Sequence, residues 1–74
     1  MTRSPFKALL VWVADHSGDV SRDAYRDKGV ELGCPPPGQN AAFGTRYPSM
    51  TRNGDRRVLT DAGYERVARY RAAA

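Results

Sequence analysis

The dipeptide Asn53-Gly54 is the feature that most constrains how this chain can fold. A two-residue hairpin turn of type I′ needs positive φ at both central residues, and asparagine followed by glycine is the pair that best tolerates this. The sequence therefore predicts a β-hairpin over residues 49–59. The expected cross-strand pairs are Arg52–Asp55, Thr51–Arg56, Met50–Arg57 and Ser49–Val58.

The second strand of this hairpin leads directly into a helix. Thr60 is placed to cap it, because its hydroxyl can accept from a free N–H group of the first turn. Leu59 and Tyr64 have the spacing of a hydrophobic staple around that cap. Tyr64 and Val67 then begin a helical repeat, so a helix is predicted over residues 60–72.

Two more helices are predicted upstream. Ser4-Pro5 has the chemistry of an N-cap followed by the first helical residue, and apolar residues at helical spacing extend a helix over residues 5–16. Ser21 is a second N-cap candidate, and charges of alternating sign predict a solvated helix over 21–32. We expect Leu59, Tyr64 and Val67 to pack on the apolar face of the first helix, which consists of Phe6, Leu9, Leu10 and Val13.

The segment between residues 33 and 47 has the least regular pattern. Cys34 precedes three consecutive prolines, which are excluded from helix interiors and central strands, so residues 33–39 are predicted to form an extended connection. Asn40 can then cap a short helix over residues 40–47, which Pro48 ends. Because Gly44 weakens so short a helix, an irregular loop is the alternative.

The residue inventory argues against an enzyme. With one cysteine and one histidine, the chain has no internal disulfide, no structural zinc site and no Ser–His–Asp or Cys–His catalytic arrangement. No glycine-rich phosphate loop follows a predicted strand. We therefore expect no catalysis, no metal, no cofactor and no small-molecule substrate. The apolar run from Ala8 to Ala14 is too short to span a bilayer, so we expect a cytoplasmic protein without membrane association.

Positive charge is concentrated in the second half of the chain. Residues 1–39 carry five basic and five acidic side chains, whereas residues 40–74 carry seven arginines and three acidic residues, which accounts for the net charge of +4. Arginine forks suit phosphates and guanine edges. A GC-rich genome is the alternative reason for arginine in place of lysine, and it explains the clustering less well.

A basic hairpin that ends in Leu-Thr-Asp-Ala-Gly and continues as an amphipathic helix resembles the wing and closing helix of winged helix-turn-helix proteins. In those proteins the second wing strand commonly ends in a Leu-Thr-x-x-Gly-type sequence. The specific part of the resemblance covers residues 50–64. It implies a mainly α fold with a small β-hairpin (α+β), in which residues 1–74 form one domain of three to four helices and a two-stranded wing. The proline-rich residues 33–39 depart from the tight turn that is usual between the helices of this motif.

The resemblance implies a small bacterial or phage regulator of transcription or replication that binds double-stranded DNA. Residues 40–47 would form its recognition helix, and the wing arginines would contact phosphates or a narrow minor groove. A homodimer would form through the first and last helices, with Tyr64, Val67 and Tyr70 at its surface. The predicted DNA-binding residues are Gln39, Asn40, Thr45, Arg46, Tyr47, Thr51, Arg52, Arg56 and Arg57.

Two other kinds of partner stay open. Winged helices also serve as protein adaptors or inhibitors, and an arginine-rich face would then bind an acidic protein surface. Single-stranded nucleic acid or RNA is the third possibility. It would require Trp12, Phe43 or Tyr47 to be exposed as a stacking platform.

Overall fold

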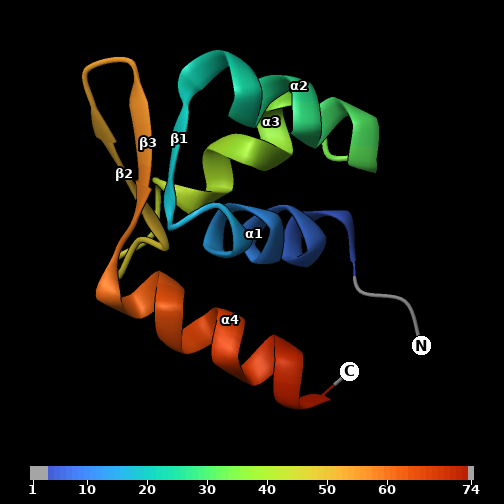
Figure 1. The fold of residues 1–74 in the computed structure, drawn as a ribbon, viewed down its shortest axis with the longest axis vertical. Coiled ribbons are helices and arrows are strands. Elements are labelled where there is room, and N and C mark those ends of the chain that lie inside the picture. Colours follow the sequence, from blue (N-terminus) through green and yellow to red (C-terminus); the bar gives the residue numbers. More distant parts are fainter. Residues whose placement is uncertain (1–3, 74) are drawn as a thin grey trace.

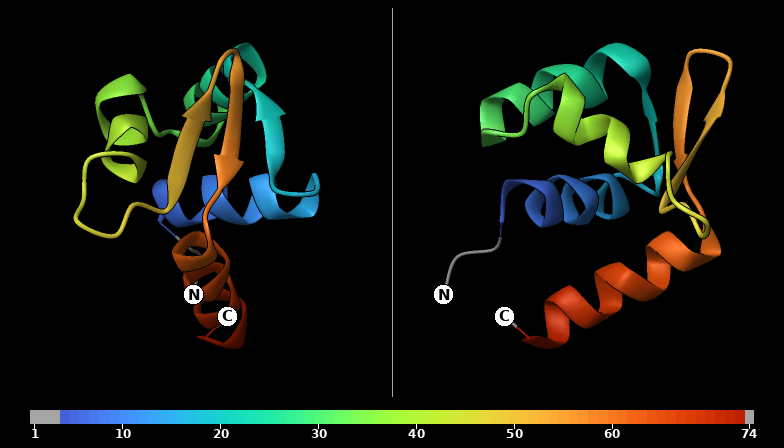
Figure 2. Two further views of the ribbon diagram at one scale, coloured as in Figure 1. Left: turned by 90° about the vertical axis from the view of Figure 1, so that its left-hand side faces the viewer. Right: turned by 180° about the vertical axis from the view of Figure 1, so that it is seen from behind.

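The computed structural model describes residues 4–73, which form helices packed against a small antiparallel sheet (Figure 1). The helix α1 lies between α4 on one side and α2 with α3 on the other, and the sheet stands at one end of these helices (Figure 2). The fold class is therefore α+β. In chain order the elements are α1 (Pro5–Asp15), β1 (Asp19–Ser21), α2 (Arg22–Leu32), α3 (Pro36–Gln39), the 3-10 turn η1 (Asn40–Ala42), β2 (Met50–Asn53), β3 (Arg56–Leu59) and α4 (Asp61–Ala73).

The two upstream helices begin where their capping residues predict. Ser4 Oγ accepts from the backbone N–H of Lys7 at 3.3 Å, and Pro5 occupies the first helical position, where it loses no hydrogen bond. Ser21 Oγ accepts from the N–H of Ala24 at 3.1 Å and caps α2. Both helices agree with the predicted boundaries to within one residue.

A short strand that the sequence pattern did not predict connects these helices. After α1, Ser17 and Gly18 adopt φ values of 67° and 71°, and the chain enters β1. β1 pairs antiparallel with β3, which gives a sheet with the order β1-β3-β2. Three residues are too few to show an alternating pattern, so this strand depends on its tertiary partner.

The predicted hairpin is present, but its turn lies one residue further along the chain. Asn53 pairs with Arg56, so the two turn residues are Gly54 and Asp55. Gly54 has a φ of 61°, whereas Asp55 has no positive φ. This matches a type II′ turn, which needs glycine only at its first central position. The predicted type I′ turn at Asn53-Gly54 is therefore wrong. Each residue of β2 pairs with a residue two positions further along β3 than predicted, so the same side chains remain on each face of the sheet.

The proline-rich segment is partly helical, contrary to the predicted extended connection over residues 33–39. Pro35 is extended and stands at the N-cap, and Pro36 and Pro37 occupy the first helical positions of α3. The N–H groups of a first turn have no partner within the helix, so prolines are tolerated there. The prolines therefore start a helix here.

The short helix that was predicted over residues 40–47 is displaced towards the N-terminus. α3 and η1 together cover residues 36–42, with Ala42 buried at the end of η1. From Phe43 to Ser49 the chain forms turns and bends without a regular helix. The irregular loop, which Gly44 favoured, is thus the correct alternative for this second part.

The Leu-Thr-Asp-Ala-Gly sequence fixes how β3 continues into α4. Leu59 is buried, and Thr60 Oγ1 accepts from the N–H of Gly63 at 3.1 Å while it donates to the carbonyl of Pro48. A Cβ atom on Gly63 would lie 2.1 Å from the carbonyl oxygen of Ser49. The glycine therefore allows the first turn of α4 to approach the chain just before β2.

The core forms around α1, which packs against both α2 and α4. Leu59 and Val67 are buried in the same cluster as the face of α1, as predicted, and Leu9, Leu10 and Val13 have 0% exposure. Tyr64 is 47% exposed, and its hydroxyl donates to the carbonyl of Ser17 at 3.3 Å. The prediction that Tyr64 belongs to this core is therefore wrong.

Candidate functional site

One face of the sheet changes from apolar to basic along its length. At one end Met50 of β2 pairs with Leu59 of β3, and two residues nearer the turn Arg52 pairs with Arg57. On its other side, Arg57 pairs with Val20 of β1. Directly opposed residues share a face, and so do residues two apart on a strand. The three apolar members are buried in the core, so this face looks towards the helices. Arg52 and Arg57 continue it towards the hairpin turn.

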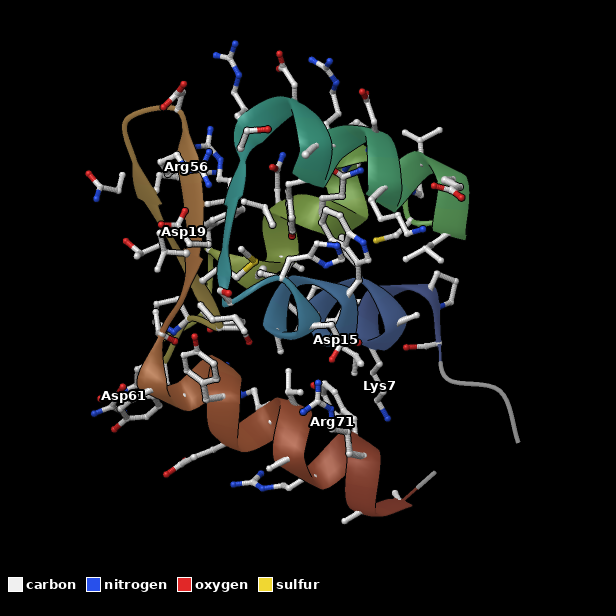
Figure 3. The ribbon with its side chains drawn as sticks, viewed as in Figure 1. Lys7, Asp15, Asp19, Arg56, Asp61 and Arg71 are labelled. Atoms are coloured by element: carbon white, nitrogen blue, oxygen red, sulfur yellow. The ribbon has the colours of Figure 1, made fainter. Side chains whose placement is uncertain are left out.

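The opposite face of the sheet holds the third arginine of the hairpin, Arg56. Arg56 donates from Nε to Oδ1 of Asp19 at 2.8 Å and from Nη2 to the Asp19 carbonyl at 3.2 Å (Figure 3). Thr51 is exposed on the same face. Because both partners of the ion pair are about half exposed, it adds little stability and leaves Arg56 accessible.

A groove of about 200 Å³ lies where the hairpin meets α2, α3 and η1. Among the residues that the structure describes, no carboxylate lines this groove. Its lining includes four arginines, two from α2 and two from the basic end of the sheet. The lining residues are Arg22, Tyr25, Arg26, Pro36, Gln39, Asn40, Phe43, Arg52 and Arg57.

Aromatic rings hold Arg52 at this groove. Its guanidinium carbon lies 4.0 Å from the centre of the Phe43 ring, which is a cation–π contact, and Phe43 packs edge-on against Tyr25 with ring centres 5.9 Å apart. Burial raises the pKa of Tyr25 above its ordinary value, and charge on Cys34 raises it further, whereas the charges of Arg52 and Arg57 lower it. Tyr25 and both arginines line the same groove.

Backbone contacts also position the other groove arginines. Arg57 donates from Nη1 to the carbonyls of Gly54 at 3.0 Å and Arg56 at 2.8 Å, which keeps its side chain beneath the hairpin turn. The N–H of Arg22 donates to the carbonyl of Asp55 at 2.6 Å. This bond joins the first residue of α2 to the hairpin turn.

The two α2 arginines form ion pairs with acidic neighbours on the same helix. Arg22 Nε lies 3.4 Å from Oδ1 of Asp23, and Arg26 Nη2 lies 3.6 Å from the same oxygen. Arg26 Nε lies 3.4 Å from Oδ1 of Asp27. All four side chains in these pairs are more than half exposed. Exposed pairs of this kind contribute about 0–1 kcal/mol, so a strong anion can compete for both arginines.

Gln39 has a structural role, which differs from its predicted contact with DNA. It is 3% exposed, and Nε2 donates to the carbonyls of Cys34 at 2.8 Å and Arg26 at 3.0 Å. The Tyr25 hydroxyl donates to the Gln39 carbonyl at 3.0 Å. These bonds join α3 to α2, and they leave no Gln39 donor for a partner.

The structure gathers only part of the predicted site. Asn40, Arg52 and Arg57 meet at the groove, whereas Thr51 and Arg56 lie on the other face of the sheet. The remaining predicted residues are exposed in the irregular segment after η1, where the Arg46 guanidinium lies 5.7 Å from the ring centre of Tyr47. These residues are Thr45, Arg46 and Tyr47.

Sequence reasoning missed Arg22 and Arg26. Their alternation with aspartates predicted only a solvated helix surface with local ion pairs. Pairing of β1 with β3 places the start of α2 beside the hairpin, and this pairing rests on three residues. No local pattern in the sequence marks that pairing.

The predicted dimer surface on α4 is reduced by its packing on α1. Val67 is 2% exposed within the core, so it is unavailable to a second subunit, contrary to the prediction. Arg71 forms an ion pair with Asp15, and Lys7 Nζ lies 5.1 Å from the centre of the Tyr70 ring (Figure 3). These contacts join α4 to α1 within one chain.

Within residues 4–73, every helix is too short or too polar to cross a membrane. Comparison of the chain with protein-family models found no matching family, and comparisons with curated proteins and with solved structures found no match. The argument for function therefore rests on the geometry and charge of the groove.

Proposed function

We propose that this protein is a winged helix-turn-helix protein that binds double-stranded DNA as a small prokaryotic or phage regulator, with the β2–β3 hairpin as its wing. The order of elements supports this: two helices, a short helical segment, a hairpin and a closing helix. The packing of Leu59, Thr60 and Gly63 supports it as well, because it gives the Leu-Thr-x-x-Gly sequence a role at the exit of the wing.

The proposal of a nucleic-acid partner rests on Arg52 and Arg57, which lie directly opposite each other on β2 and β3. Like charges directly opposite each other on neighbouring strands destabilise a sheet. Arg22 and Arg26 add two further positive charges to the same groove. A pairing of like charges that costs stability is expected at functional sites, where a ligand can offset it. A DNA phosphate would supply the missing negative charge.

Base contacts would come from few side chains. The exposed surface of α3 and η1 includes Pro36, Pro37 and Ala41, which have no side-chain donors, and Asn40, which can pair with adenine. Arg46 in the following segment is exposed and can reach a guanine edge if that segment lies along the major groove. Phosphate contacts would therefore supply most of the affinity.

A binding assay with matched variants tests this function. Fluorescence anisotropy with a random duplex at about 50 mM salt is expected to show binding by the wild type, and the affinity should fall about tenfold or more in Arg52→Ala/Arg57→Ala. The control Arg69→Ala/Arg71→Ala removes the same charge from the exposed part of α4 and should change affinity little.

Two results would contradict the proposal. An equal loss of DNA affinity in the two double variants would mean that binding depends only on the net charge of the protein. A folded wild type that fails to bind any duplex at about 50 mM salt would exclude DNA as the partner, because non-specific binding is strongest at low salt. The basic surface would then be a docking face for an acidic protein.

A further inference from the structure

We infer that the groove between the hairpin, α2, α3 and η1 is a site for a single phosphate group, which Arg52 and Arg57 hold jointly. The inference rests on the proposed function for the source of that phosphate, the backbone of DNA. The site itself is formed by the chain alone, so a free phosphate compound can occupy it as well.

The register of the sheet places Arg52 and Arg57 side by side at the groove. They are directly opposed on β2 and β3 and lie on the same face. Cβ atoms of such a pair are about 4.5–5.5 Å apart, so the two side chains start side by side. A guanidinium presents a planar fork of donors that matches phosphate oxygens. Two forks that start this close together suit one phosphate between them.

Two arginines of the groove are held in place before any ligand arrives. Arg52 is stacked on Phe43, and Arg57 donates to two backbone carbonyls near the turn. Arg22 is joined to Asp55 only through its backbone N–H, and its side chain is more than half exposed. Side chains that are already positioned lose less conformational entropy on binding. These contacts favour Arg52 and Arg57 as the pair that holds the anion.

The charge of the groove calls for a compact anion with more than one negative charge. Arg22 and Arg26 approach from α2 and Arg52 and Arg57 from the sheet, and no carboxylate lines the groove among residues 4–73. Arg22 and Arg26 also form exposed ion pairs with Asp23 and Asp27, whereas Arg52 and Arg57 face each other directly across the strands. A phosphate offsets the repulsion between the opposed arginines, and a single carboxylate offsets less of it.

Thermal unfolding with small anions tests the site without DNA. Millimolar pyrophosphate or inorganic phosphate, compared with chloride at equal ionic strength, should raise the melting temperature of the wild type by several degrees, because a ligand that binds only the folded state stabilises it. The shift should persist in Arg69→Ala/Arg71→Ala and disappear in Arg52→Ala/Arg57→Ala. The melting curve itself reports whether each variant is folded. Equal shifts in all three proteins would overturn the site.

Salt dependence of DNA binding tests whether the phosphate is shared. Each neutralised phosphate contributes about 0.9 to the slope of log affinity against log salt. If Arg52 and Arg57 hold one phosphate, the slope for Arg52→Ala/Arg57→Ala is smaller than that of the wild type by about 0.9 in total. If each binds its own phosphate, the loss is about 1.8. The larger loss would overturn the shared site and leave the proposed DNA binding intact.

The two proposals can fail separately. In one outcome, pyrophosphate raises the melting temperature only when Arg52 and Arg57 are present, while the protein binds no duplex DNA. This pair of results would support the phosphate site and overturn the DNA function. The phosphate would then come from a free compound. An acidic glutamate peptide that stabilises the protein more than pyrophosphate does at equal concentration would overturn the phosphate site in favour of a carboxylate partner.

Discussion

Single residues set how closely the elements of this small domain approach one another. Gly63 is buried in the first turn of α4, and a Cβ atom there would meet the carbonyl oxygen of Ser49 at 2.1 Å and the Leu59 side chain at 2.8 Å. The nearest obstacle belongs to the backbone, so it cannot move aside as the end of a flexible side chain would. Gly44 differs, because a Cβ atom there would have its nearest neighbour at 3.8 Å.

These two glycines provide a matched test of the junction between β3 and α4. In an exposed helix, Gly→Ala is stabilising by about 1 kcal/mol. At Gly63 we expect the reverse, a loss of about 1–3 kcal/mol, because the added methyl group forces the backbone apart. Gly44→Ala should leave the stability unchanged or raise it slightly. Urea unfolding of both variants measures the difference, and a stabilised Gly63→Ala protein would show that the junction is misplaced.

At the scale of elements, those with local signals were predicted and those that depend on distant partners were not. Ser4, Ser21 and Thr60 mark helix starts through hydrogen bonds within three residues along the chain, and this chemistry is visible in the sequence. The hairpin likewise follows from a short glycine-containing turn. β1 exists only through its pairing with β3, and its three residues give no pattern. The start of α3 was missed because prolines exclude a helix interior but not its first turn.

The position of the hairpin turn can be tested by two neighbouring substitutions. Gly54 has a positive φ, and a Cβ atom added there would meet no other atom within 4 Å, so the cost of Gly54→Ala comes from its backbone conformation alone. That cost is about 1–2 kcal/mol. Asn53 lies in β2 with no positive φ, so Asn53→Ala should change stability by less than about 0.5 kcal/mol. Similar losses in both variants would instead favour a type I′ turn centred on Asn53-Gly54.

At the scale of the whole molecule, the core and the candidate site meet at Tyr25. Its ring is buried in the core cluster, and its hydroxyl supports α3 through the Gln39 carbonyl. The same ring packs against Phe43, which holds Arg52 at the groove. The basic half of the hairpin could be recognised from the sequence. The groove could not be, because its arginines come from α2 and the sheet, and only the folded arrangement joins them.

The burial of Tyr25 gives the stability of the whole domain a pH dependence at alkaline pH. Burial raises the pKa of Tyr25 in the folded state, whereas the unfolded chain has the ordinary value of about 10. Below that pH both states hold the proton, so this residue makes no pH-dependent contribution. Above it the unfolded state releases the proton and the folded state keeps it, so the free energy of unfolding falls as pH rises.

Tyr25→Phe isolates this effect. At neutral pH the variant should be less stable by about 1–2 kcal/mol, because the buried Gln39 carbonyl loses its donor. Above about pH 10 the wild type should lose up to about 1.4 kcal/mol per pH unit relative to the variant, so the gap between them narrows. Burial also raises the pKa of Cys34, but that thiol is present in both proteins and largely cancels in the comparison. Urea unfolding at pH 8, 9, 10 and about 11 measures the gap. If the free energies of unfolding of the two proteins change in parallel with pH, the Tyr25 hydroxyl is open to solvent and is not buried between the core and the groove.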